Sequence, residues 1–314
     1  MNLLAAMRYL VALDKHRHFA RAARACHITQ PALSNALRAL EDEFGVAIIK
    51  RARTYGGLTR EGEAVLDTAQ HMLRELERLT QELQSTAESP RGVLRMAAVP
   101  TAMPLLMVFA AMLRRRYPGL VPTVLAMSSP EIEAQLEDAS LDLALGYMER
   151  LTEKAGRLRS WPQARERYYF LRRQTGKPGR LLRYGSPMTW SEAATHPLCQ
   201  LTPEMHNRTI IDATLASVGM SSAPAIETNS LLAVTLAVSV GDVCAILPGD
   251  MVAAVRGNAE LEARPLVKPD IRVPLGFIAL VDDRPSRALQ AALRLMAAPE
   301  WTAALEKHAG EAGF

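Results

Sequence analysis

The sequence lacks the features that would tie it to a membrane. No run approaches the roughly 18 consecutive apolar residues that span a bilayer, and residues 2–18 form an amphipathic pattern without a signal-peptide cleavage site. We therefore expect a cytoplasmic chain with no membrane partner. Aromatic residues are few at 5%, while 49% apolar and 22% charged residues are ordinary for a globular protein, so composition alone assigns no special class.

Cysteine is scarce too. Cys26, Cys199 and Cys244 are odd in number, widely spaced and set among apolar or neutral neighbours, which argues against a disulfide framework and predicts buried thiols. The seven histidines do not cluster with cysteines or carboxylates at metal-ligand spacing. Along the sequence, no lysine or arginine adjoins Cys199 or Cys244, so we expect no lowered thiol pKa at either residue. We expect neither a metal, nor a cofactor, nor a redox-sensing cysteine pair.

The length and the charge distribution indicate more than one domain. At 314 residues the chain is about two to three times a typical domain. Its net charge of +4 is uneven, because residues 1–60 hold 10 Lys/Arg against 4 Asp/Glu, leaving −2 for the remainder. A basic segment of this kind attracts a polyanion such as DNA.

The first 60 residues have the pattern of a small helical domain. Apolar spacing predicts helices over 3–13 and 19–26 and a third helix from a cap at Thr29 to Phe44. The third helix has a narrow apolar stripe, so its opposite face is polar and exposed. That face displays Pro31, Ser34, Asn35, Arg38 and Asp42.

A basic hairpin is expected next. Residues 46–49 followed by Lys50, Arg51 and Arg53 around a Gly-Gly pair predict a short β-ribbon with a basic tip. Such a wing would lie along phosphates.

A long helix begins at Thr59, and its apolar residues step by three and four from Leu66 to Leu83. Such a seam needs a partner, so we expect a homodimer through residues 59–89, with the helix lying on its own domain as the alternative. Residues 89–92 break the helix and form a hinge.

The remaining sequence alternates strand-like and helix-like segments. This alternation is a βαβ pattern and predicts an α/β domain with parallel strands. The segments are 93–99, 105–116, 121–126, 131–139 and 141–146, then 168–172, 198–201, 207–218, 231–239 and 243–247.

The segment Phe19–Glu41 resembles the winged helix-turn-helix of LysR-type transcriptional regulators. The resemblance continues through Phe44-Gly45, Lys50-Arg51 and residues 58–62, and the α/β pattern to about residue 300 is consistent with it. Cys26 and Ile48-Ile49 depart from the family pattern only by exchanging apolar groups.

The resemblance implies an N-terminal all-α winged helix-turn-helix, a linker helix, and a C-terminal α/β effector domain of two periplasmic-binding-protein-like subdomains. It also implies a homotetramer on double-stranded DNA, with RNA polymerase as a partner if the protein is an activator. The expected limits are 1–58, 59–89 and 90–314, with subdomain I at about 92–163 and 268–300 and subdomain II at about 164–267.

The expected DNA contacts follow from side-chain chemistry on the third helix. Gln30 suits adenine, and Arg38 suits guanine or a phosphate. Basic residues outside that helix are expected on phosphates or in solvent. The full set is Gln30, Pro31, Ser34, Asn35 and Arg38, with Arg21, Lys50, Arg51 and Arg53.

By the same resemblance, a small-molecule effector lies in the cleft between the subdomains, where strand carboxyl ends also place ligands in open sheets. Val99 stands where family members often have serine. Ser128-Ser129 is equally an ordinary helix cap, and His206 and Arg208 are more simply surface groups. The expected ligand contacts are Pro100, Thr101, Ala102, Ser128, Ser129, Thr202 and Asn229.

The segment Leu198–Asp212 is similar to LysR-type regulators linked to formate and one-carbon oxidation genes, which implies a small anionic effector such as formate. Residues 150–183 hold 11 Lys/Arg against two acidic residues. This stretch is either a lure for an anion or a second DNA contact, or else a solvated loop and a charged edge strand, which we favour.

Two other functions compete with an effector-controlled regulator. One is a ligand-independent architectural DNA-binding protein, and the other is an α/β enzyme fused to a DNA-binding domain. No Gly-rich phosphate loop or nucleophile elbow is visible, so we expect no catalysis. In the favoured mechanism, ligand closes the cleft, the subdomains rotate and the spacing of paired helix-turn-helix units changes.

Overall fold

A computed structural model describes residues 2–50, 55–86, 88–149, 157–176, 179–281 and 285–308. The chain forms two compact units, Met1–Gln84 and Ser85–Phe314. The first is helical and the second is a mixed α/β unit, which confirms the predicted fold class. Within the described ranges, no helix combines the length and the apolar character needed to cross a membrane.

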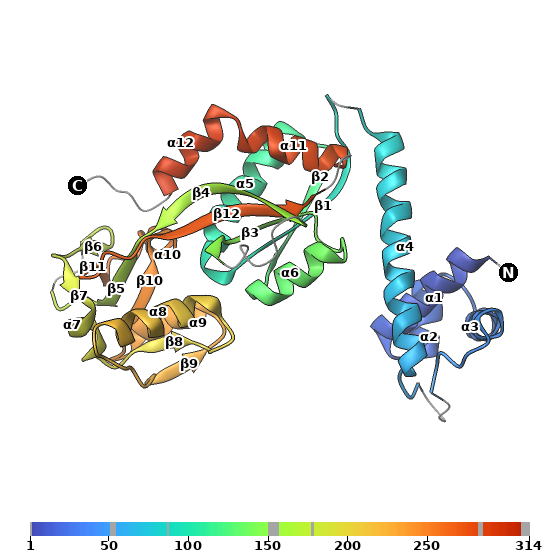
Figure 1. The fold of residues 1–314 in the computed structure, drawn as a ribbon, viewed down its shortest axis with the longest axis horizontal. Helices are drawn as coiled ribbons and strands as arrows, with labels where there is room; N and C mark the ends of the chain where they lie inside the picture. The colour runs from blue at the N-terminus through green and yellow to red at the C-terminus, as the bar shows by residue number, and fades with distance from the viewer. Residues whose placement is uncertain are drawn as a thin grey trace. The chain divides into compact units, whose positions relative to one another are not determined.

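The N-terminal unit contains the predicted helices (Figure 1), and their ends follow from capping residues. Asn2 Oδ1 accepts a hydrogen bond from the Ala5 amide at 3.1 Å, and Thr59 Oγ1 accepts one from the Gly62 amide at 2.9 Å. Gly45 ends the third helix in the left-handed conformation, with φ +66°. The helices are α1 (Leu3–His16), α2 (Phe19–Ala25), α3 (Gln30–Phe44) and α4 (Arg60–Gln84).

The core of this unit is the apolar stripe of α3. Leu33, Leu37 and Leu40 are fully or almost fully buried, together with Leu10 and Leu13 of α1. Each buried leucine stabilises the fold by about 1.5–3 kcal/mol, so this stripe fixes which face of α3 remains free.

The predicted wing is reduced to a minimal hairpin in the described residues. Ile49 and Leu58 form an isolated antiparallel bridge, and the Lys50 amide donates to Gly57 O at 3.0 Å. The tip residues Arg51 and Arg53 lie outside the described residues.

Helix α4 contacts α1 of its own domain, which is one of the two alternatives expected for its apolar seam. Ala69 of the helix is fully buried. Other apolar residues of the helix stay exposed, namely Met72, Leu79 and Leu83, the last two at 55% and 78%.

The first sheet of the C-terminal unit has the order β2-β1-β3-β12-β4. Strands β1, β2 and β3 are parallel as predicted, whereas β12 runs antiparallel to β3 and β4. Helices α5 and α11 contact the sheet through β1, and α6 contacts it through β3 and β12 (Figure 1). The elements are β1 (Gly92–Ala98), η1 (Pro100–Ala102), α5 (Met103–Arg116), β2 (Leu120–Ala126), α6 (Ser129–Glu137), β3 (Leu143–Tyr147), β4 (Leu158–Glu166), β12 (Val273–Leu280), α11 (Arg287–Met296) and α12 (Pro299–His308).

The second sheet is mixed, so the expectation of parallel strands is wrong for β5 and holds for β6 and β7, which pair parallel with β11. Its order is β10-β5-β11-β6, and β5 runs antiparallel to both β10 and β11. Strand β5 comes from β4 of the first sheet through Arg167, and its neighbours β10 and β11 follow far along the chain, so no βαβ unit links β5 to either of them. The elements are β5 (Tyr168–Arg173), β6 (Arg183–Tyr184), β7 (Met188–Thr189), α7 (Trp190–Ala194), β8 (Cys199–Leu201), α8 (His206–Ser217), β9 (Ile226–Thr228), α9 (Leu231–Val240), β10 (Ala245–Pro248), α10 (Gly249–Ala254) and β11 (Leu261–Val267).

The chain passes between the two sheets twice, at Arg167 and over residues 268–272. The second crossing is tied to the second sheet's helices, because the buried Trp190 indole N–H donates to Pro269 O at 3.0 Å. The Trp190 ring also lies 5.8 Å from that of Tyr168, just after the first crossing.

Candidate functional site

Helix α3 presents a free polar face. Gln30, Pro31, Asn35 and Arg38 are exposed and Ser34 is half-buried, while the leucine stripe holds the opposite face in the core. Arg21 on α2 and Lys50 after α3 are exposed as well. The sequence therefore identified the accessible side of this helix, and the individual DNA contacts stay predictions.

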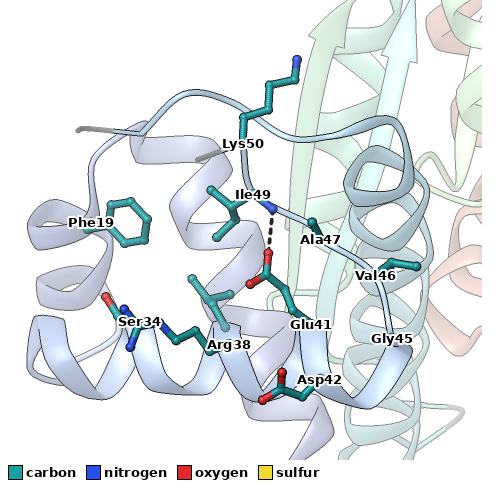
Figure 2. A pocket seen from close by; sticks show the side chains of 11 residues that line it. Phe19, Ser34, Arg38, Glu41, Asp42, Gly45, Val46, Ala47, Ile49 and Lys50 are labelled. Carbon is teal, nitrogen blue, oxygen red and sulfur yellow. Dashed lines mark hydrogen bonds between the residues drawn. The ribbon is translucent and has the colours of Figure 1, made fainter. Parts of the chain in front are cut away.

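A groove of about 920 Å³ runs between α3 and the segment that follows it (Figure 2). Ser34 and Arg38 line it from the helix, Lys50 lines it from the start of the hairpin, and Phe19 lines it from α2. The carboxylate of Glu41 also faces this space, but its Oε1 accepts the amides of Ile48 and Ile49 at 2.8 and 3.0 Å. Those bonds hold the segment beside the helix.

The groove has the chemistry of a phosphate-binding surface at one end. Arg38 and Lys50 supply positive charge, and Ser34 supplies a hydroxyl. Asp42 also lines the groove and would repel a phosphate there, so the favourable part of the groove is the part beside Arg38 and Lys50.

A second cavity lies in the C-terminal unit, between the carboxyl ends of β1 and β3 and the loop that joins β8 to α8. It is nearly closed, with an open volume of about 10 Å³, which is room for about one water molecule. Its lining combines hydroxyl, amide, imidazole and apolar groups. The lining residues are Val99, Pro100, Thr101, Ser128, Ser129, Tyr147, Leu201, Met205, His206 and Asn207.

A hydrogen-bonded cluster joins the two sheets beside this cavity. Thr101 Oγ1 lies 2.8 Å from the Tyr147 hydroxyl, and Asn207 Nδ2 donates to the hydroxyls of Tyr168 at 3.1 Å and Tyr147 at 3.5 Å. Ser129 Oγ is buried without a hydrogen-bond partner. A ligand with oxygen acceptors can satisfy such donors.

Two buried carboxyl groups lie near the first crossing. Both oxygens of Glu166 and Oδ2 of Asp250 have no hydrogen-bond partner. Burial raises the pKa of Asp250 to about 7. Burial and then the negative charge of Asp250 raise the pKa of Glu166 well above its usual range.

The structure brings only part of the predicted ligand set together. Pro100, Thr101, Ser128 and Ser129 line the cavity, with Ser128 also capping α6 through Glu131. Three predicted residues do not line it. Ala102 is fully buried, the Thr202 hydroxyl donates to Glu204 at 2.7 Å, and Asn229 is exposed.

Three polar lining residues were not predicted as ligand contacts. Tyr147 ends a fully buried strand, so its signal was a single polar group at the end of an apolar run. Asn207 is buried in the first turn of α8 but follows a mostly polar segment, which gave no such signal. His206 was set aside as a surface group, yet its ring packs edge-on against Tyr147 at 5.0 Å.

Arg208 was expected to be a surface group, but the structure buries it and gives it a structural role. It is buried and binds Asp212 at 2.8 Å and Glu227 at 3.2 Å, and it donates to Leu201 O at 2.9 Å. Those bonds use its guanidinium to join α8 to β8 and β9.

The basic stretch 150–183 does not converge on one site in its described part. Arg172 and Arg183 both pair with Glu262, at 2.6 and 3.6 Å, whereas Arg167 pairs with Asp270 at 3.4 Å. Three of the basic residues, Arg150, Lys154 and Lys177, lie outside the described residues.

The two C-terminal cysteines face opposite sides of one sheet. Leu198 is bridged to Cys244, so these two side chains share a face, and Cys199, one residue further on, points to the other. Their packing agrees, because Cys244 and Cys199 belong to different apolar clusters. Burial raises the pKa of both thiols. Among the described residues, no group of three or more His, Cys, Asp or Glu side chains is arranged to hold a metal ion.

Curated transcription regulators are similar to this chain in amino-acid sequence. A "Hydrogen peroxide-inducible genes activator" from Pectobacterium carotovorum subsp. carotovorum is 36% identical over 148 residues, 47% of this chain and 49% of that protein. The match thus spans about half of the relative's length. An "SDS degradation transcriptional activation protein" from a Pseudomonas species is 30% identical over 279 residues and covers 81% of each chain.

Solved structures share the fold. CbnR, described as a LysR family transcriptional regulator, superposes with a TM-score of 0.72 at 19% identity, covering 94% of this chain and 98% of that one. Full-length CbnR in complex with its target DNA gives 0.72 at 20% identity, covering 93% and 99%.

Family models match both units. Residues 4–63 match "Bacterial regulatory helix-turn-helix protein, lysR family", and residues 87–298 match "LysR substrate binding domain". The second match alone spans more than half of the chain, and the first falls on the helices that carry the free polar face. The chain belongs to the LysR family of bacterial transcription regulators.

Proposed function

We propose that this protein is a cytoplasmic DNA-binding transcription regulator controlled by a small molecule in the cavity of its C-terminal unit. The observation that carries the proposal is the free polar face of α3 beside a groove with Arg38 and Lys50. A helix of this kind enters the major groove while neighbouring cations meet phosphates.

The DNA-binding proposal is tested by selecting duplexes from a randomised library with the full chain. We then expect Arg38→Ala to weaken binding to the selected duplex by about 1–3 kcal/mol and to relax the preference at one base pair. Arg8→Ala is the matched control, since Arg8 is exposed and lines a different groove, beside α4. Equal losses for both variants on every sequence would leave Arg38 without a base-reading role.

The effector proposal rests on the hydroxyl, amide and imidazole groups of the small cavity. These groups favour a compact ligand with oxygen acceptors, and we propose a small carboxylate such as formate. Calorimetry with formate and with its uncharged analogue formamide compares the two binding affinities. The difference between them shows how much the negative charge of the ligand contributes beyond its shape. If formate binds to the wild type and not to Asn207→Ala, the result supports this site. If neither compound gives a binding heat, formate is excluded as the effector.

The relatives named for hydrogen peroxide raise redox sensing as a second candidate. We propose that this chain does not form a sensing disulfide between Cys199 and Cys244, because their side chains lie on opposite sheet faces and burial raises both pKa values. Thiol titration after mild peroxide treatment should still find both thiols. If the titration finds both thiols lost together, and Cys244→Ser prevents the loss of the Cys199 thiol, this proposal is wrong.

We further propose that the protein assembles through α4 into dimers and then into tetramers. The exposed apolar residues of α4 support a helix partner. RNA polymerase is a further partner only if the regulator activates transcription.

We also propose that the protein has no enzymatic activity, and turnover of a bound ligand by the purified protein would refute that.

A further inference from the structure

Tyr55, three residues before Leu58 of the hairpin, occupies a socket formed where α1 ends and α2 begins. Its hydroxyl donates to Asp14 Oδ1 at 3.3 Å. The Arg17 guanidinium lies 5.7 Å from the centre of its ring, and the Phe19 ring meets it edge-on with centroids 6.3 Å apart. Asp14, Arg17 and Phe19 thus contact a half-buried tyrosine that comes from a different part of the N-terminal unit.

The socket is held in shape by the turn itself. Arg17 adopts the left-handed conformation with φ +51°, and its amide donates to Leu13 O at 2.8 Å to end α1. Its guanidinium then pairs with Asp14 Oδ1 at 3.0 Å. This left-handed backbone is energetically unfavourable for a residue other than glycine. The contacts of the Arg17 side chain with Asp14 and Tyr55 offset that cost and so stabilise the turn.

The socket connects directly to the DNA-facing groove. Phe19 lines that groove, and Lys50, on the opposite wall, is bonded through its amide to Gly57 O, two residues beyond Tyr55. The hairpin has only an isolated bridge, Ile49 to Leu58, among the described residues. Two strands joined so sparsely do not fix their own orientation.

We propose that Tyr55 is a positioning residue for DNA binding, because its socket sets the angle of the hairpin and thereby keeps Lys50 beside the groove. This inference rests on the proposed DNA-binding function. In this proposal Tyr55 positions the hairpin and is not itself a DNA contact. It acts through Lys50 and the hairpin backbone.

The experiment measures binding to the selected duplex by fluorescence anisotropy across a series of KCl concentrations, using the full chain. We expect Tyr55→Ala to weaken binding by about tenfold and to reduce the slope of log affinity against log salt by about one, as for a lost phosphate contact. Tyr55→Phe keeps the ring contacts and loses only the bond to Asp14, so its loss should be about threefold. Asp14→Ala removes the acceptor of that bond and also the ion-pair partner of Arg17, so its loss should be at least as large as that of Tyr55→Phe.

Tyr9→Phe is the matched control, since it removes a hydroxyl from a half-buried tyrosine of α1 that packs against the same core. Thermal unfolding of each sample gives the folded fraction. An unchanged salt slope in Tyr55→Ala, or losses that merely follow the folded fraction, would overturn the positioning role. If the wild-type chain selects no duplex at all, the DNA-binding function itself fails, which is a different result.

Discussion

Two buried carboxyl groups, Glu166 and Asp250, sit where the C-terminal unit changes from one sheet to the other. Glu166 ends β4 directly before the crossing residue Arg167, and the Gly249 amide, next to Asp250, donates to Arg167 O at 2.9 Å. Unpartnered carboxylates are costly in such surroundings, so at neutral pH the pair retains protons that it would lose in water. Stability of this unit should therefore depend on pH.

We expect Asp250→Asn to stabilise the protein at pH 8 and to flatten its pH dependence. In the unfolded chain Asp250 ionises near pH 4, whereas in the folded chain its pKa is about 7. Between these values the unfolded state binds fewer protons, so the free energy of unfolding falls as pH rises. The gain at pH 8 should approach about 4 kcal/mol and vanish near pH 4.

Urea unfolding between pH 5 and 8 checks this. Asp242→Asn, at an exposed aspartate of the same unit, is the control and should follow the wild type. Parallel curves for Asp250→Asn and wild type would show that the Asp250 carboxyl adds nothing to the pH dependence.

At the scale of elements, the contact between α3 and the hairpin depends on one glutamate. Glu41 comes from the helix and accepts two successive amides of the strand that follows it. The start of α4 closes the same corner, because a Cβ at Gly62 would overlap the carbonyl of Ile48. Helix, strand and linker therefore meet around residues 48 and 49.

Glu41→Ala should destabilise the N-terminal unit by about 1–3 kcal/mol, since it leaves two part-buried amides without their charged acceptor. Glu41→Gln retains an acceptor oxygen and should lose less. Urea unfolding followed by helical circular dichroism provides the measurement. Glu43→Ala removes an exposed carboxylate from the same helix, and a loss equal to that of Glu41→Ala would contradict the role of the amide bonds.

The helical domain was predictable because its signals are local. Periodicity and the caps Asn2, Thr29 and Thr59 gave the helix starts. Strand direction in the second sheet was not predictable, since the partners of β5 come from residues 245–248 and 261–265, far along the chain. Thr202 and Asn229 had the expected polarity, yet side-chain direction at a strand end depends on the local turn, and neither lines the cavity.

At the scale of the whole molecule, the apolar residues of α4 are covered in one part of the helix and exposed in another. Ala69 is buried in the unit in which α4 contacts α1, whereas Leu79 and Leu83, further along the helix, remain exposed. Leu79 and Leu83 are four residues apart and so lie on one face of the helix. A second copy of the same helix is the partner that this stripe best fits.

Leu83→Lys combined with Leu79→Lys should shift the protein from its assembled state to monomers at micromolar concentration, because charges would have to be buried in the helix interface. Sedimentation equilibrium measures the mass. Gln84→Lys adds a charge to the same turn about 100° away and should leave assembly unchanged. An unaltered mass for the double variant would exclude this face as the interface.

The bond between Trp190 and Pro269 gives the C-terminal unit an optical probe of its own. The indole N–H of Trp190 is tied to the segment that crosses between the sheets, whereas that of Trp301 is bonded to Gln163 within the first sheet. Any ligand that bends the crossings must change the surroundings of Trp190 and leave those of Trp301 nearly constant. With Trp161 and Trp301 replaced by phenylalanine, the emission of Trp190 should report effector closure without an attached dye.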